Sequence, residues 1–101
     1  MLWALYYVAV PNAMQLRQKE LMEAHRAYLK SQKDILVLAA PMERDDGSNF
    51  LGAVRIIHVN TRAEAEAFSD GDPFVQAGMF TSITITRARK GRWNPEAAEG
   101  A

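Results

Sequence analysis

The chain opens on the apolar run LWALYYVAV, residues 2–10, and the rest of the fold is arranged around it. Its aromatic and β-branched residues favour a strand, and apolar residues on both faces indicate a central position in a sheet. The run stops at Pro11-Asn12, whereas a helix that crosses a membrane needs about 20 apolar residues, so we expect no membrane partner. No basic segment or small-residue cleavage pattern accompanies the run. We therefore expect no signal peptide and a cytoplasmic location.

Further elements follow from the hydrophobic pattern downstream of this strand. Asp46-Gly47 marks a hairpin turn, and Thr61 with Glu64 forms a capping box at the start of a helix. Proline at position 41 is expected to end the second strand. The pattern predicts a helix over 15–33, strands over 35–40 and 50–59, a helix over 61–69, a short turn over 74–78 and a strand over 79–88.

These elements follow one another in the order βαββαβ, which is that of a ferredoxin-like α+β sandwich. Right-handed crossovers place the first and third strands at the centre of a four-stranded sheet, parallel to each other, with both helices on one face. The other face is left with apolar residues of the first strand, Arg55 or its neighbours, and a hydroxyl row of Ser82, Thr84 and Thr86. Because such a face favours association, we expect a homodimer in which two sheets pack face to face, with a higher oligomer left open.

The composition narrows the classes of function. The 101 residues make one domain, which we assign to residues 1–94, followed by a polar tail at 95–101. Twelve Lys and Arg balance twelve Asp and Glu, so no overall basic field points to a nucleic acid partner. The absence of cysteine excludes thiolate nucleophiles and zinc sites built on cysteine. Four basic residues gather within 87–92, where a solvated strand end is preferred over a patch for an anionic ligand.

Few side chains are suited to chemistry. The two histidines, His25 and His58, lie 33 positions apart without metal-ligand spacing, and no glycine-rich phosphate motif is present. We therefore expect no metal and no cofactor. His25 lies within the apolar face of the helix at 15–33. It is either a core histidine bonded to a backbone carbonyl or an acid–base residue in a pocket. His58 is interpreted as exposed or structural.

Asp72 and Arg55 are the other candidates. Asp72 precedes Pro73, which is the pattern of a helix N-cap followed by proline at the first helical position. One carboxylate oxygen can cap the helix while the other faces His25 and fixes its tautomer. Arg55 stands in a mostly apolar strand as an interface residue, paired with a carboxylate, or as a clamp for a substrate anion, and the first is preferred.

Six segments together carry a resemblance to a known family. The last is the most specific, because Asp-Pro-Phe, Ala-Gly and Phe stand at the family's spacing downstream of His-x-x-Tyr-Leu. On these segments the chain resembles the YCII-related (YciI-like) family over about residues 1–94. The segments are Leu2–Val8, Ala24–Leu29, Ala40–Met42, Phe50–Gly52, Ala63–Phe68 and Asp72–Phe80.

The resemblance implies a ferredoxin-like dimer of the dimeric α+β barrel superfamily. It also implies an active site with a His–Asp dyad, and these roles fall on His25 and Asp72. One relative is implicated in the dechlorination of a hydroxyquinone. The class of reaction implied is thus acid–base chemistry on a small cyclic or aromatic molecule.

Three positions depart from the family's pattern. Ala40 stands where glycine usually precedes the proline, Ala53 stands where many members carry serine, and Met22 stands where some carry arginine. The last two changes remove polar groups that help to hold an anionic substrate.

Two functions from different classes fit these residues. The first is a small enzyme of the lyase or isomerase type that needs no cofactor, in which His25 transfers a proton and Asp72 orients the imidazole. The alternative is a non-catalytic homodimer that binds a small ligand or assists another protein, with a purely structural His–Asp contact. For either function, the substrate or ligand pocket is expected to be walled by Tyr7, Pro41, Met42, Phe74 and Phe80.

Overall fold

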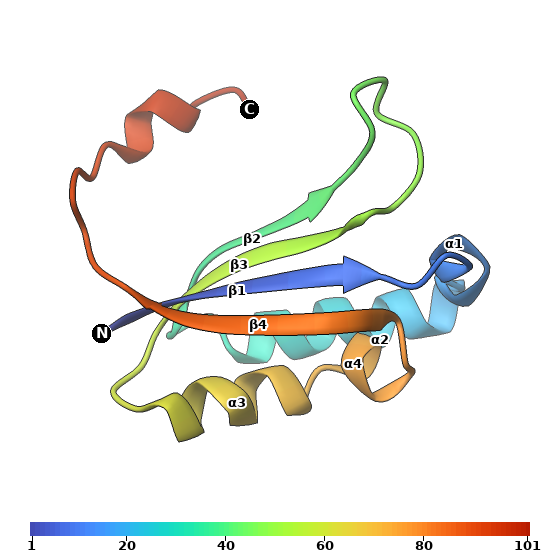
Figure 1. The fold of residues 1–101 in the computed structure, drawn as a ribbon, viewed down its shortest axis with the longest axis horizontal. Coiled ribbons are helices and arrows are strands. Elements are labelled where there is room, and N and C mark those ends of the chain that lie inside the picture. The colour runs from blue at the N-terminus through green and yellow to red at the C-terminus, as the bar shows by residue number, and fades with distance from the viewer.

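The computed structural model describes residues 1–101, and Figure 1 shows a four-stranded sheet with its main helices on one side. The predicted ferredoxin-like α+β fold is confirmed, and the short turn predicted over 74–78 is present as a short helix capped by Asp72. The elements are β1 (Leu2–Ala9), α1 (Ala13–Leu16), α2 (Lys19–Ser31), β2 (Leu36–Met42), β3 (Gly52–His58), α3 (Arg62–Asp70), α4 (Pro73–Gln76), β4 (Phe80–Ala88) and a 3-10 turn (Pro95–Ala98).

The sheet has the strand order β2-β3-β1-β4, so β1 and β3 are central as predicted. All neighbouring strands are antiparallel, and the prediction that the first and third strands run parallel to each other is wrong. The reason is topological. The crossover through α2 makes β2 parallel to β1, and the β2–β3 hairpin then reverses the chain, so β3 returns antiparallel to β1. The sheet is open and does not close into a barrel.

Two predicted boundaries differ from the observed ones. The helix expected over 15–33 is interrupted, because Arg17 and Gln18 have ψ values of 59° and 161°, outside the helical range. The second strand continues through Pro41 to Met42 instead of ending at the proline. An edge strand tolerates proline because one of its sides has no partner to which an N–H must be donated.

The core lies between the sheet and the helices. Alternate residues of β1, namely Trp3, Leu5 and Tyr7, are buried on this side together with Ile57 of β3 and Phe68 of α3. Complete burial of an apolar side chain of this size contributes roughly 1.5–3 kcal/mol. A second cluster joins α1 and α4 to the ends of the strands, and its members are Ala13, Phe50, Phe74 and Met79. This second cluster anchors the helix that begins at Asp72.

Neither α2 nor α3 covers the opposite face of the sheet (Figure 1). It exposes Tyr6 to 49% and Leu38 to 51%. The register pairs Val8 with Ser82, Tyr6 with Thr84 and Ala4 with Thr86, so the predicted hydroxyl row lies on this face. Arg55 does not. It is 2% exposed on the helix-covered side, and alternation places its neighbours Val54 and Ile56 on the open face instead.

The C-terminal tail leaves the end of β4 and arches over the side of the sheet that α2 and α3 do not cover (Figure 1). Its last ordered element is the 3-10 turn. The ammonium group of Lys90 lies 5.4 Å from the centre of the Trp93 ring, a cation–π contact on an exposed surface. None of the helices combines the length and the hydrophobicity that crossing a bilayer requires.

Candidate functional site

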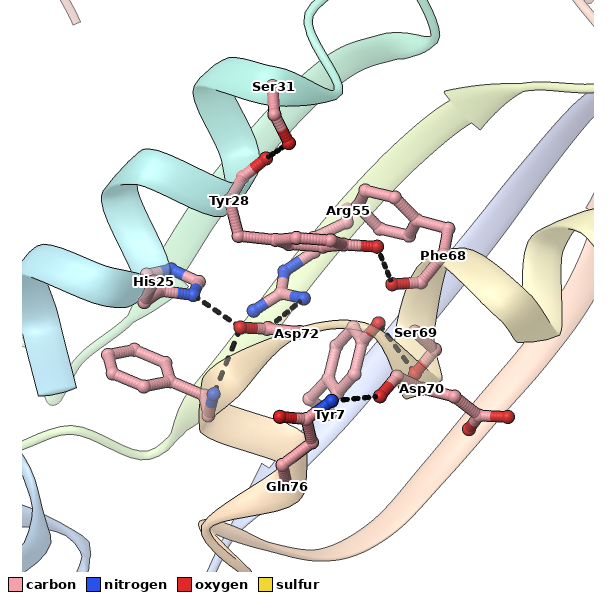
Figure 2. A network of polar contacts seen from close by, with 11 residues as sticks. Tyr7, His25, Tyr28, Ser31, Arg55, Phe68, Ser69, Asp70, Asp72 and Gln76 are labelled. Carbon is pink, nitrogen blue, oxygen red and sulfur yellow. Dashed lines mark hydrogen bonds and ion pairs between the residues drawn. The ribbon is translucent and has the colours of Figure 1, made fainter.

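Three side chains from distant parts of the chain meet beneath α2. His25 comes from the middle of α2, Arg55 from the central strand β3, and Asp72 from the residue that begins α4. Figure 2 shows Asp72 between the other two, with dashed lines to both. The fold therefore joins an imidazole, a carboxylate and a guanidinium in one chain of polar contacts.

The contact between His25 and Asp72 is a short hydrogen bond. His25 Nδ1 lies 2.7 Å from Asp72 Oδ1. Because an ionised carboxylate only accepts hydrogen bonds, Nδ1 donates in this contact, which in the neutral imidazole leaves the lone pair on Nε2. The imidazole also stacks on the ring of Phe74, with centroids 3.8 Å apart and planes 5° apart. The hydrogen bond and the stacking together fix both the tautomer and the plane of the histidine.

Asp72 also holds the local backbone. Its side chain caps α4, since Oδ1 accepts from the backbone N–H of Phe74 at 3.0 Å, and Pro73 occupies the first helical position. The same oxygen thus serves both the cap and His25, where the sequence suggested one oxygen for each. Oδ2 is left for Arg55, whose Nη1 lies 2.6 Å away as an ion pair.

The charge of Asp72 is set by these neighbours. The side chain is 0% exposed, and burial alone raises the pKa of a carboxyl. The hydrogen bond from His25 and the positive charge of Arg55 outweigh burial and hold the pKa of Asp72 below its usual value of 3.8. Asp72 is therefore an anion at neutral pH although it is shielded from water.

Arg55 and Tyr7 form the floor beneath this carboxylate. The guanidinium of Arg55 lies 4.3 Å from the centre of the Tyr7 ring. The hydroxyl of Tyr7 donates to Ser69 Oγ at 3.1 Å, and burial raises the pKa of Tyr7. Tyr7 is consequently a neutral structural phenol that supports the arginine from below.

A cavity of about 200 Å³ opens beside His25, between α2, β2 and β3. Its wall is mostly apolar, and its charged members are all basic. Two residues that we predicted for the pocket, Pro41 and Phe74, line it. The lining residues are Arg17, Met22, His25, Arg26, Leu29, Ala39, Ala40, Pro41, Phe50, Ala53, Arg55 and Phe74.

The other three residues predicted for the pocket do not line this cavity. Tyr7 is 0% exposed beneath Arg55. Phe80 packs on Tyr7, with ring centroids 4.9 Å apart, and belongs to the core. Met42 follows Pro41 in β2, so alternation turns it to the other face of the sheet. The structure thus brings His25, Asp72, Pro41 and Phe74 together and leaves these three apart.

The lining residues that sequence reasoning missed include two charged ones, Arg17 and Arg26. Arg17 lies at the break between α1 and α2, and the sequence carries no glycine or proline there to mark it. Arg26 follows His25 directly, on the polar side of an amphipathic helix. His58 is exposed and lies away from the cavity. Nowhere do three or more histidine or acidic side chains gather closely enough to bind a metal ion.

The chain is similar to proteins of known structure. Among solved structures, the chain is similar to 5-chloro-2-hydroxyhydroquinone dehydrochlorinase (TftG) from Burkholderia phenoliruptrix AC1100, determined in complex with 2,5-dihydroxybenzoquinone. The two are 26% identical and have a TM-score of 0.81, over 90% of this chain and 96% of TftG. A weaker likeness is to Rv0793 from Mycobacterium tuberculosis, at 12% identity and a TM-score of 0.46, over 88% and 94% of the two chains.

Among curated proteins, none matches the chain. A comparison with protein families, in contrast, matches the YCII-related domain over residues 1–89, which includes every element of the sheet and the whole of the His25–Asp72–Arg55 arrangement. A match over so much of the chain settles its family. The chain belongs to the YCII-related domain family.

Proposed function

We propose that the protein is a small-molecule enzyme of the lyase or isomerase type, in which His25 transfers a proton and no cofactor takes part. The observation that carries this proposal is the 2.7 Å hydrogen bond between His25 Nδ1 and Asp72 Oδ1, made at the wall of a mostly apolar cavity. This arrangement leaves Nε2 as the basic atom available to a ligand.

The chemistry requires little movement of the protein. Nε2 takes a proton from the bound molecule, and the electron pair left behind forms a new double bond as a leaving group departs or as the imidazolium returns the proton to another atom of the molecule. The positive charge that develops on the imidazole lies against the Asp72 carboxylate, which is already ionised and needs no reorganisation. Stacking on Phe74 keeps the ring in position during the transfer.

The similarity to TftG supports this class of reaction. The name of that enzyme describes removal of hydrogen and chloride from a hydroxylated ring, which requires a base for the proton. The size of the cavity agrees with such a substrate. A dry cavity of about 150 Å³ holds one benzene ring, so about 200 Å³ accepts a single six-membered ring with small substituents.

The experiment compares the two histidines of the chain. Purified protein is given 5-chloro-2-hydroxyhydroquinone, and chloride release is followed together with deuterium exchange from solvent into related hydroxyquinones. His25→Gln is expected to lower the rate by about 10²–10⁴-fold, the usual contribution of a positioned acid or base. His58→Gln, which changes an exposed histidine far from the cavity, is the matched control and is expected to keep full activity. Equal rates for His25→Gln and wild type would overturn the proposal.

A binding module without chemistry is the second candidate, and one observation favours it. Asp72 also caps α4 and pairs with Arg55, so the contact with His25 has a structural use of its own. In that case His25→Gln lowers the free energy of unfolding by about 1–3 kcal/mol while ligand affinity stays the same. Thermal shift with 2,5-dihydroxybenzoquinone, measured on both proteins, separates this outcome from a loss of turnover.

We further propose that two copies pair through the open face of the sheet. The support is a surface that neither α2 nor α3 covers, on which Tyr6, Val8 and Leu38 are between 37% and 51% exposed. A contiguous apolar surface of this kind is uncommon on monomers. Sedimentation at micromolar concentration is expected to give a mass twice that of the 11.3 kDa chain, and a monomer would contradict the proposal.

A further inference from the structure

We propose that the cavity beside His25 takes a small planar oxyanion, a ring carrying a carboxylate or a phenolate oxygen, and that Arg17 receives its negative charge. The inference rests on the site described under the proposed function and names the chemical class of its substrate. Its own test measures binding, so it stands or falls separately from catalysis.

The ionisable side chains around the cavity are all basic. Three arginines and His25 line it, and no carboxylate does. Arg55 is already matched by Asp72 at 2.6 Å. The only ion pairs of the chain are those of Asp72, so neither Arg17 nor Arg26 has a carboxylate oxygen within 4.0 Å. A chain with no net charge thus concentrates two unmatched positive charges at one small cavity.

Arg17 is held in place, but its hydrogen-bond donors lack strong acceptors. Its guanidinium lies 4.5 Å from the centre of the Phe50 ring, and its backbone is held by the end of α1. The Nε–H is buried without any hydrogen-bond partner, and Nη1 reaches only the sulfur of Met14 at 3.7 Å. A thioether is a weak acceptor. Arg17 therefore presents a guanidinium that is held in position but whose N–H groups have no strong hydrogen-bond acceptor. The oxygen of a ligand anion supplies such an acceptor.

The apolar side chains of the cavity wall bear on the shape of the ligand. The apolar part of the lining includes the rings of Phe50, Phe74 and Pro41. The imidazole of His25 lies parallel to the Phe74 ring. A planar ring that enters this space has apolar contacts on its faces, with a base at one part of its edge and Arg17 at another.

The test uses two pairs of planar probes that differ in charge. Benzoate is compared with benzamide, and 4-nitrophenolate with 4-nitroaniline in mildly alkaline buffer, by calorimetric titration. At least one anion is expected to bind about tenfold or more tightly than its neutral partner, the value of one charge-assisted hydrogen bond. The pair that shows the preference identifies the anion as a carboxylate or a phenolate.

Variants assign the preference to a residue. Arg17→Gln is expected to abolish it, and Arg17→Lys to retain part of it, because lysine keeps the charge without the planar fork. Arg44→Gln changes an exposed arginine in the β2–β3 loop and is expected to change nothing. Thermal melts check that each variant is folded. If the neutral probes bind as tightly as the anions, if no anion binds, or if Arg17→Gln keeps the preference, the inference is overturned.

The same titrations on His25→Gln keep the two proposals apart. This variant lacks the group that transfers the proton but retains Arg17, so it is expected to bind the anion with the same preference. Missing turnover combined with intact anion preference would overturn only the proposed function. Intact turnover combined with no dependence on Arg17 would overturn only the present inference.

Discussion

Arg55 Nη1 lies 2.6 Å from Asp72 Oδ2, and both side chains are closed off from solvent. Buried charges are tolerated only in pairs, because each alone would lose its hydration without compensation. The arginine therefore stabilises the buried charge of the carboxylate, as hydration does for a carboxylate at the protein surface. It keeps Asp72 ionised at a place where His25 can use the negative charge.

Removing Arg55 should strand a buried anion. We expect Arg55→Met to lower the free energy of unfolding by about 3–5 kcal/mol, the usual effect of breaking one side of a buried pair. Urea denaturation measures it. The double variant Arg55→Met with Asp72→Asn should recover part of the loss, because no unpaired charge remains. A single variant as stable as wild type would show that the ion pair contributes nothing.

The stability that Asp72 provides should depend on pH in one direction. Its pKa is lowered in the folded protein, so its contribution is complete above the usual carboxyl value of 3.8 and is lost as pH falls through the lower, folded-state pKa. Asp72→Asn keeps a residue that can cap α4 but removes the charge. The gap in urea midpoint between wild type and Asp72→Asn should be widest near neutrality and should narrow below about pH 4.

A control for this titration is Asp45→Asn, which changes an exposed carboxylate in the loop between β2 and β3. It should track the wild type at every pH. A gap for Asp72→Asn that stays constant down to the acid limit would mean that the carboxyl has an ordinary pKa in the folded state.

The stacking of His25 on Phe74 should matter for turnover more than for folding. Phe74→Leu removes the flat surface under the imidazole, and a ring that tilts away from its position can lower the rate by up to about a hundredfold. Phe68→Leu is the matched control, since Phe68 is equally buried but packs in the other core cluster. Both variants should lose about 1–3 kcal/mol of stability, and only Phe74→Leu should lose activity. Equal activities in the two variants would show that the stacking has no role.

Close packing at Gly71 should make that position intolerant of a side chain. A methyl group there would lie 2.6 Å from the hydroxyl of Tyr28, which is held by the carbonyl oxygen of Phe68 at 2.7 Å. Gly71→Ala is expected to destabilise the fold by about 1–3 kcal/mol through this overpacking. Gly91→Ala, where nothing lies within 4 Å, should be neutral. Adding Tyr28→Phe to Gly71→Ala should relieve part of the strain, and thermal melts on the four proteins decide.

The proposed dimer predicts a simple effect of charge on the open face. Tyr6 is 49% exposed at the middle of β1, so two sheets packed face to face would bury it. Tyr6→Arg should shift sedimentation from dimer toward monomer while the thermal melt of the monomer stays cooperative. Lys30→Glu, an exposed change on α2, should leave the mass unaltered.

The order of the elements was predictable, because each strand and helix has its own hydrophobic period. The relative direction of the central strands follows from the same order, because a crossover to β2 and a hairpin to β3 leave β3 antiparallel to β1. The prediction that they run parallel overlooked the reversal at the hairpin. Arg55 shows a limit of periodicity. Gly52–His58 is apolar on both faces, so alternation alone did not reveal that the arginine faces the helices.

The site was predictable in part for a similar reason. His25 interrupts an apolar stripe and Asp72 precedes proline, and both irregularities are visible in the sequence. Arg17 has no such mark. Its place at the cavity depends on a break between α1 and α2, and the sequence at this break contains neither glycine nor proline. Tyr7 and Phe80 are aromatic residues near the site, but their side chains pack in or against the core and do not line the cavity.

Asp72 accepts hydrogen bonds from a helix N-terminus and from a histidine with one oxygen, and pairs with a buried arginine through the other. Natural selection on stability alone would therefore favour keeping Asp72, whether or not the domain carries out a reaction. His25 has fewer structural partners, namely the Asp72 carboxylate and the Phe74 ring. Under the proposed function, the histidine rather than the aspartate would be the first of the two residues to drift in a lineage that no longer needs the reaction.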